Sequence, residues 1–172
     1  MIDAAICILR PWREDDIERL AELANDVDVS RYMADRFPHP YTVEEARLWI
    51  GVHRGISPTN NFAIEVDGKV AGGIGMDPLE GERRITAVFG YWLGRAYWGR
   101  GIATAACAAF TDYAMNERGF VRLEAAVYAP NVASMRVLEK CGYTCEGTMR
   151  KAIVKRGELL DAYLYAKIKL GV

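Results

Sequence analysis

The sequence predicts one domain with a mixed α and β fold (α+β), built from about seven strands and about four helices. Three observations support this fold class. Some segments alternate apolar and polar residues, as strands do, whereas others repeat apolar residues every three or four positions, as helices do. These segments follow neither the steady β-α-β alternation of a doubly wound sheet nor an all-β pattern. The 172 residues contain no repeat, linker or low-complexity segment, so one domain is predicted over 1–172.

The first part of the chain predicts a strand followed by two helices. The run CILR at 7–10 is short and apolar, and the segment 17–24 places apolar residues at helical spacing behind an acidic cluster. Thr42 followed by Glu45 forms a capping-box pattern. A second helix is therefore expected to begin directly after Thr42.

The middle of the chain predicts a β-hairpin and then a strand, a glycine loop and a helix. Apolar residues alternate on both sides of Asp67 and Gly68, a dipeptide suited to a tight hairpin turn. The segment 85–93 is apolar, β-branched and aromatic, as buried strands are. From Ile102 the apolar residues recur at helical spacing until Gly119 ends the helix.

The last third predicts a strand at 122–128, a short helix that ends before Gly142, and two strands. The two strands are expected to turn at Arg156 and Gly157.

The charge balance argues against a nucleic-acid partner. There are 22 Lys and Arg residues against 23 Asp and Glu residues, and the net charge of -1 gives no basic footprint. No apolar stretch approaches the ~18 residues of a membrane span, and no secretory leader begins the chain. The sequence therefore predicts no membrane partner and a cytoplasmic location.

The cysteines and histidines do not predict a metal site. The four cysteines follow no metal-ligand spacing, and only two histidines exist to complete a site. These residues are Cys7, Cys107, Cys141, Cys145, His39 and His53. No metal is predicted, and free cysteines fit a reducing compartment.

The phrase YWGRGIAT places Gly99 and Gly101 just before a helix. A helix begins with free backbone N–H groups and a partial positive charge, so a loop leading into it suits an anion. Glycine permits the positive φ angles that fold consecutive amides into a concavity, and Arg100 adds charge. The alternative is that the glycines only make a strand-to-helix turn. The loop lacks the Lys-Ser/Thr ending of a P-loop and the third glycine of a dinucleotide fingerprint.

The phrase NVASMRVLEKCGY places Asn131 and Ser134 three residues apart. Both are expected on one face at the first turn of a helix, where their polar atoms can reach a ligand. Alternatively, Asn131 is only an N-cap that accepts a hydrogen bond from the amide near Ser134.

Together these phrases, with ILRPWREDD, PYTVEEARLWI and EGTMRKAIVKRGELLDAYLYA, resemble the GNAT superfamily of acyl-CoA N-acyltransferases. The resemblance covers nearly the whole chain and is strongest to the ribosomal-protein alanine N-acetyltransferases. It implies a central, mostly antiparallel sheet and an acetyl-CoA cosubstrate. The residues that it assigns to acetyl-CoA are Tyr91, Trp92, Leu93, Gly99, Arg100, Gly101, Ile102, Ala103, Thr104, Asn131 and Ser134.

The chain departs from the family pattern at two positions. The pyrophosphate loop of the family begins with Gln or Arg, but here that position is Ala96, and Arg95 one residue earlier is a candidate substitute. Many relatives place a tyrosine seven residues after the asparagine, but here that residue is Leu138. The ribosomal-type branch instead carries a serine three residues after the asparagine, and Ser134 fills that position.

The predicted reaction is direct attack of a primary amine on the thioester of acetyl-CoA. It needs a proton for the departing sulfur, which Ser134 can donate, and a base for the amine. The candidate bases are Glu124, Glu146, Glu158 and Asp161. Asp161 is favoured because it interrupts an apolar strand, where aspartate is disfavoured, and its alternative role is a structural hydrogen bond.

The acceptor is expected to be a protein N-terminal α-amine or a small-molecule amine. The alternative function is a non-catalytic module that binds or senses CoA. Similar proteins often pair as homodimers, so the resemblance also suggests a homodimer.

Overall fold

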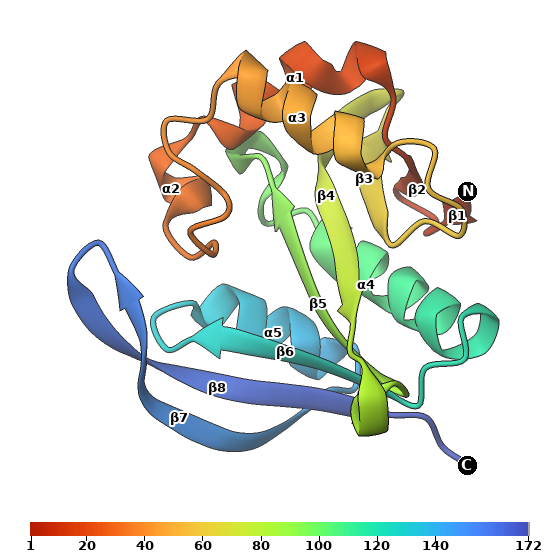
Figure 1. The fold of residues 1–172 in the computed structure, drawn as a ribbon, viewed down its shortest axis with the longest axis vertical. Helices are drawn as coiled ribbons and strands as arrows, with labels where there is room; N and C mark the ends of the chain where they lie inside the picture. Colours follow the sequence, from red (N-terminus) through yellow and green to blue (C-terminus); the bar gives the residue numbers. More distant parts are fainter. Residues whose placement is uncertain (172) are drawn as a thin grey trace. The chain divides into compact units, whose positions relative to one another are not determined.

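The computed structural model describes residues 1–171, which form two compact units (Figure 1). The first unit comprises Met1–Met76 and Gly90–Phe110, and the second comprises Asp77–Phe89 and the chain from Thr111 onward. Each unit therefore consists of two stretches that are separated in the sequence. The prediction of a single domain over 1–172 stays a prediction.

The first unit contains the N-terminal helices. In order along the chain it holds β1 (Ile2–Asp3), β2 (Ile8–Pro11), η1 (Glu14–Asp16), α1 (Ile17–Ala24), α2 (Val27–Ser30), α3 (Val43–His53) and β3 (Asn61–Val66), followed by most of β4 (Lys69–Pro78), the end of β5 (Thr86–Leu93), η3 (Arg95–Tyr97) and most of α4 (Ile102–Asp112). Strands β1 to β3 pair antiparallel in sequence order, and β3 pairs antiparallel with β4.

The second unit contains the C-terminal strands. It holds the remaining ends of β4, β5 and α4, then η2 (Gly81–Arg83), the π-helical turn η4 (Tyr113–Glu117), β6 (Arg122–Tyr128), α5 (Val132–Lys140), β7 (Thr144–Lys155) and β8 (Glu158–Ile168). Strand β5 pairs in parallel with β6, whereas β6 with β8 and β8 with β7 pair antiparallel.

The predicted fold class is confirmed, with two corrections to the number of elements. The strands follow the hydrogen-bonded order β1-β2-β3-β4-β5-β6-β8-β7 in an eight-stranded, mostly antiparallel sheet. The additional strand is β1, and the additional helix is α2, so residues 1–171 form eight strands and five α-helices. No helix within residues 1–171 has the length and apolar composition that crossing a bilayer requires.

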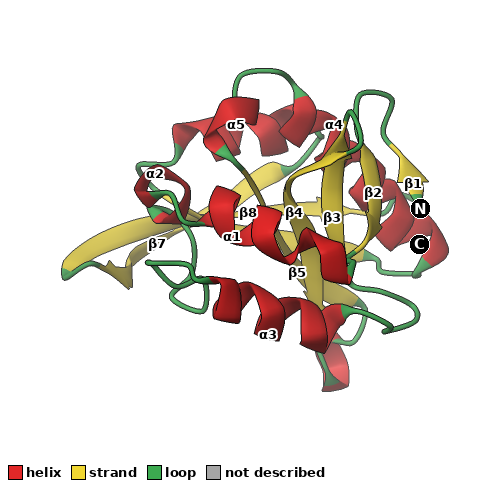
Figure 2. Cartoon of the chain, turned by 90° about the horizontal axis from the view of Figure 1, so that it is seen from above, coloured by secondary structure: helices red, strands yellow, loops and turns green. Residues whose placement is uncertain are grey.

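Helices α1 and α3 are neighbours in the first unit, as Figure 2 shows. The N-cap predicted for α3 is confirmed, because the Thr42 side chain accepts a hydrogen bond from the Glu45 amide at 3.2 Å. Leu20 of α1 and Ile50 of α3 are each 1% exposed. The buried apolar cluster of this unit comprises Trp12, Leu20, Ala21, Leu23, Ala24, Tyr41, Ala46, Ile50, Ala63 and Val70.

A buried ion-pair network includes Asp16, the acidic residue directly before α1. Arg10 of β2 is 3% exposed and donates two hydrogen bonds to the carboxylate of Asp16, at 2.7 and 2.8 Å, while also pairing with Glu65. Asp16 additionally accepts a hydrogen bond from the Arg13 amide at 2.8 Å. The hydrogen bonds that Arg10 donates to Asp16 and Glu65 raise the pKa of its guanidinium. The charges are therefore paired where desolvation would otherwise destabilise them.

The two predicted hairpin turns have the expected backbone. Asp67 and Gly68 take φ angles of 50° and 72°, and Arg156 and Gly157 take 52° and 81°. Positive φ at both central residues is what a type I′ hairpin turn requires.

Gly72 of β4 lies where the end of β5 approaches most closely. A Cβ atom at Gly72 would overlap the carbonyl oxygen of Trp92 and lie 2.9 Å from the Cα atom of Leu93. The amide of Gly94 also donates to the carbonyl of Ala71 at 2.8 Å. The two backbones are therefore too close for any side chain at this position.

We expect Gly72→Ala to lower the free energy of unfolding by about 1–3 kcal/mol, because the strands must separate to admit the methyl group. Urea denaturation measures this loss. The matched control is Gly51→Ala in α3, where a Cβ would meet nothing within 4 Å. That variant should gain about 0.5–1 kcal/mol, because alanine is the better helix former. Equal stability of Gly72→Ala and the wild type would contradict the close approach.

The second unit is dominated by a long hairpin of β7 and β8, drawn in blue in Figure 1. The register of this pair shifts between Met149 and Ile153, and Lys151 within the shift has a φ angle of 50°. Such a bulge places extra residues in one strand and bends it. Asp161 of β8 lies opposite this bulge.

Candidate active site

The glycine loop connects η3 to α4 and has the predicted backbone. Gly99 and Gly101 take φ angles of 73° and 78°, which confirms the positive φ expected at both positions. A Cβ atom at Gly99 would meet nothing within 4 Å, and one at Gly101 would meet only Ile6 Cδ1 at 3.8 Å. Backbone conformation, rather than crowding within the protein, therefore requires glycine here.

Helix α4 begins directly after this loop. Its first residue, Ile102, is 2% exposed, and Ala103 and Thr104 are half-buried. The Ala105 amide donates to the Gly101 carbonyl at 3.0 Å, so the helical hydrogen bonds start at the second glycine. The first turn of a helix carries a partial positive charge, which in general favours anions.

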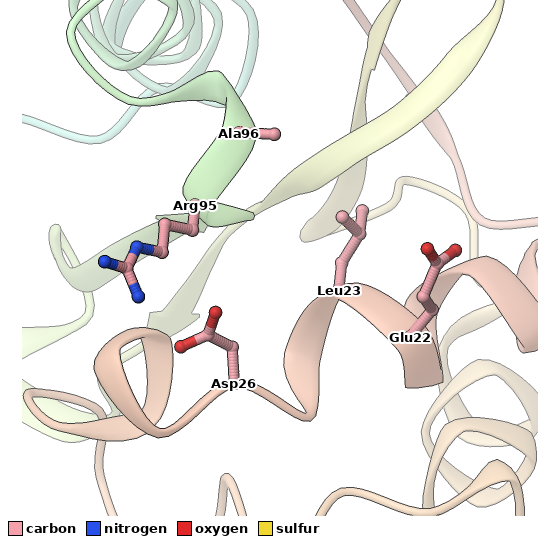
Figure 3. A pocket seen from close by; sticks show the side chains of 5 residues that line it. All are labelled: Glu22, Leu23, Asp26, Arg95 and Ala96. Carbon is pink, nitrogen blue, oxygen red and sulfur yellow. The ribbon is translucent and has the colours of Figure 1, made fainter.

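Arg95, which precedes Ala96, forms an ion pair. The Arg95 guanidinium donates to the Asp28 carboxylate at 2.7 Å. An open cavity of about 440 Å³ lies here, and Figure 3 shows the five side chains that line it. They are Glu22, Leu23, Asp26, Arg95 and Ala96. The predicted substitution of Arg95 for the missing first residue of the loop motif would therefore compete with Asp28.

The end of β5 supplies the residues predicted to contact the pantetheine arm. Tyr91 and Trp92 are half-buried, and Leu93 is 7% exposed. The indole nitrogen of Trp98 donates to the Leu93 carbonyl at 2.8 Å, an interaction that the sequence did not indicate. This hydrogen bond links the start of the glycine loop to the end of β5. The assignment of these residues to acetyl-CoA stays a prediction.

Asn131 is the N-cap of α5, as the structural alternative expected. Its Oδ1 atom accepts a hydrogen bond from the Ser134 amide at 3.2 Å. Ser134 is half-buried in the first turn of α5. The cap fixes the start of the helix and thereby the position of the serine. A contact of either residue with a cofactor stays a prediction.

Leu138, which occupies the position of the tyrosine found in many relatives, has an exposed fraction of 0%. Its side chain is apolar, so it supplies no proton donor. The role of Ser134 as the proton donor to the departing sulfur stays a prediction.

Two of the four candidate bases are held in ion pairs. Glu124 is 7% exposed and pairs with Arg83 at 2.6 Å and with Arg122 at 2.9 Å. Glu146 accepts two hydrogen bonds from Arg122, at 2.8 and 2.6 Å, and these lower the pKa of its carboxyl group. A carboxylate that is already paired with arginine is a poorer proton acceptor. The geometry therefore argues against Glu124 and Glu146 as the base.

Asp161 lies in β8 and is half-buried, whereas Glu158 is exposed beside the hairpin turn. The Oδ1 atom of Asp161 accepts a hydrogen bond from the Lys151 amide in the β7 bulge at 2.7 Å. The Asp161 carbonyl accepts a hydrogen bond from the Ala129 amide at 2.9 Å. Ala129 directly precedes the loop to α5, so the second unit brings Asp161 close to the start of that helix.

The described residues 1–171 contain no group of three or more histidine, cysteine, aspartate or glutamate side chains that could hold a metal ion. None of the four cysteines, all within residues 1–171, forms a disulfide bond: Cys7, Cys107 and Cys141 are buried, and Cys145 is exposed.

Comparison with known proteins identifies the family. The sequence model described as the acetyltransferase (GNAT) domain matches residues 7–144. The N-acetyltransferase p20 of Bacillus licheniformis is 31% identical over 168 residues, which cover 94% of this chain and 92% of p20.

Solved structures agree with this match. An acetyltransferase of the GNAT family from Bacillus anthracis superposes with a TM-score of 0.85 at 28% identity, covering 97% of each chain. The ribosomal alpha-N-protein acetyltransferase RimL, solved with coenzyme A, superposes with a TM-score of 0.82 at 23% identity, covering 95% of this chain and 94% of RimL. The chain therefore belongs to the GNAT family, as an acetyl-CoA-dependent N-acetyltransferase.

Proposed function

We propose that this enzyme transfers the acetyl group of acetyl-CoA to a primary amine by direct attack, with the loop from Gly99 to Thr104 receiving the pyrophosphate. The observation that carries the proposal is the pair of positive-φ glycines, with Arg100 between them, immediately before α4. Two positive-φ glycines, a helix N-terminus and a guanidinium all favour the same anionic ligand.

Ser134 is proposed as the proton donor of the reaction. As the amine nitrogen bonds to the carbonyl carbon, the bond from carbon to sulfur breaks and the sulfur gains negative charge. A hydroxyl that donates to this sulfur stabilises the transition state more than the ground state. The half-buried Ser134, fixed in the first turn of α5 by the Asn131 cap, supplies that group.

Asp161 is proposed as the group that accepts the proton lost by the amine, directly or through water. Its Oδ1 atom is used by the Lys151 amide, so the proposed acceptor is Oδ2. The ion pairs at Glu124 and Glu146 support this choice, because those carboxylates are already neutralised by arginines.

The acceptor is proposed to be a primary amine, either a protein N-terminal α-amine or a small-molecule amine. A panel of peptides and small amines, assayed for release of the CoA thiol, assigns the class. Thiol release with any member supports catalysis. Binding of acetyl-CoA without release for the whole panel would favour the non-catalytic alternative, a module that senses CoA.

The proposed pyrophosphate site predicts that a negative charge introduced into the glycine loop weakens the binding of acetyl-CoA. Acetyl-CoA at 100 times its Kd should stabilise the folded wild type by ~2.7 kcal/mol, measured as a rise in Tm. Gly101→Glu should abolish this rise, because it places a carboxylate where the pyrophosphate binds.

The matched control for this variant is Gly119→Glu. Gly119 has a φ angle of 76°, against 78° for Gly101, and a Cβ at Gly119 would meet nothing within 4 Å. Both variants therefore carry the same backbone strain. Because Gly119 lies outside the glycine loop, Gly119→Glu should keep the full response to acetyl-CoA. A folded Gly101→Glu protein with unchanged affinity would show that the glycines serve only the turn.

A further inference from the structure

Arg100, the charged residue of the glycine loop, lies over an aromatic ring. Its Cζ atom is 5.7 Å from the centroid of Tyr97, three residues earlier. This separation is within the range of a cation–π interaction. Within residues 1–171, Arg100 stacks over no other aromatic ring and forms no ion pair with an acidic side chain. The guanidinium is therefore oriented by a ring and its hydrogen-bond donors stay available to an anion.

Tyr97 is itself held by a chain of contacts from α1 and β4. Its hydroxyl oxygen accepts a hydrogen bond from the Arg19 guanidinium at 3.2 Å. Arg19 in turn donates to Glu22 at 2.6 Å and to the Val70 carbonyl at 3.3 Å. The Tyr97 amide also donates to the Gly94 carbonyl at 2.9 Å. The ring under Arg100 is thus fixed at its hydroxyl and at its backbone.

We propose that Tyr97 is a positioning residue, which presents the Arg100 guanidinium to the phosphates of the acyl donor. The inference rests on the proposed function, in which the glycine loop receives the pyrophosphate. A free arginine side chain loses conformational freedom when it binds an anion, and a guanidinium already held over a ring loses less. No sequence signal could reveal the support from Arg19, which lies 78 residues from Tyr97.

The experiment is a double-mutant cycle on Kd for acetyl-CoA, measured by calorimetry. Arg100→Ala should raise Kd about tenfold or more, because it removes charge-assisted hydrogen bonds. Tyr97→Leu should raise Kd about two- to fivefold, the equivalent of an exposed cation–π interaction. Tyr97→Leu combined with Arg100→Ala should bind no more weakly than Arg100→Ala alone, because the ring acts through the arginine.

Tyr97→Phe is the matched control, since it keeps the ring and loses only the hydroxyl that Arg19 contacts. It should bind acetyl-CoA more tightly than Tyr97→Leu. A donor without phosphates separates positioning from general damage. With any amine found active, Arg100→Ala and Tyr97→Leu should each lower kcat/KM by a larger factor with acetyl-CoA than with acetyl-pantetheine.

Additive losses in the cycle, or an equal loss of activity with acetyl-pantetheine, would overturn the inference and assign Tyr97 to packing. Arg100→Ala with the affinity of the wild type would also overturn it, while leaving acetyl-CoA binding by the loop intact. Failure of the wild type to bind acetyl-CoA would overturn the proposed function itself, so the two failures are distinguishable.

Discussion

Ser134→Ala is expected to lower kcat by about 10²-fold, with little change in the Kd for acetyl-CoA. The hydroxyl contributes mainly after negative charge has begun to develop on sulfur, so its loss raises the barrier without weakening ground-state binding. Single-turnover rates at saturating acetyl-CoA, with any amine that the panel shows to be active, measure the chemical step directly.

Asn131→Ala provides the control for this experiment, because it perturbs the same helix turn without removing the hydroxyl. The loss of the hydrogen bond from the Ser134 amide should lower the free energy of unfolding by about 1 kcal/mol. Its effect should appear in stability or in acetyl-CoA affinity before it appears in the rate. If Ser134→Ala turned over as fast as the wild type, Ser134 would be a helix-terminus residue and water would protonate the sulfur.

Asp161→Asn is expected to lower kcat by about 10²-fold while leaving Tm close to that of the wild type. The asparagine retains an Oδ1 atom that can accept the hydrogen bond of the Lys151 amide, but it cannot take a proton from the amine. This variant therefore separates the chemical role of the carboxylate from its structural role.

Asp161→Ala completes the comparison, because it removes both roles. It should lose the same activity and, in addition, about 1 kcal/mol of stability from the hydrogen bond to the bulge. Thermal melts of both variants and their kcat values form the measurement. Full activity in Asp161→Asn, together with a lowered Tm in Asp161→Ala, would make Asp161 a purely structural residue and reopen the identity of the base.

The sequence predicted those parts of the fold that local chemistry determines. The turns at Asp67-Gly68 and Arg156-Gly157, the Thr42 cap and the glycine loop all depend on residues next to one another. The four-residue helix α2 was missed because its apolar pattern is too short to show a period, although Asp26 caps it through the Asp28 amide at 2.7 Å. The two-residue strand β1 exists through pairing with β2, which no local pattern records.

In the candidate site, too, the features set by neighbouring residues could be predicted, whereas those set by distant residues could not. The positive φ angles of Gly99 and Gly101 and the cap at Asn131 follow from residue type and spacing, and these were predicted. The pairing of Glu124 with Arg83 and Arg122 could not be predicted, because it depends on which face of β6 is buried and on a loop 41 residues away. The sequence favoured Asp161 from its place in an apolar strand, but it gave no reason to set aside Glu124 and Glu146, which the ion pairs supply.

The β7 bulge opposite Asp161 also bears on how the protein avoids self-association. Strand β7 is last in the strand order, so within residues 1–171 no strand pairs with its outer edge. An exposed, regular edge invites another chain to add a strand, and a bulge or a lysine at such an edge hinders that addition. Here the left-handed residue in the bulge is Lys151, and the Asp161 carboxylate holds its amide. We therefore expect the hydrogen bond that shapes the hairpin also to hinder the addition of another strand at this edge.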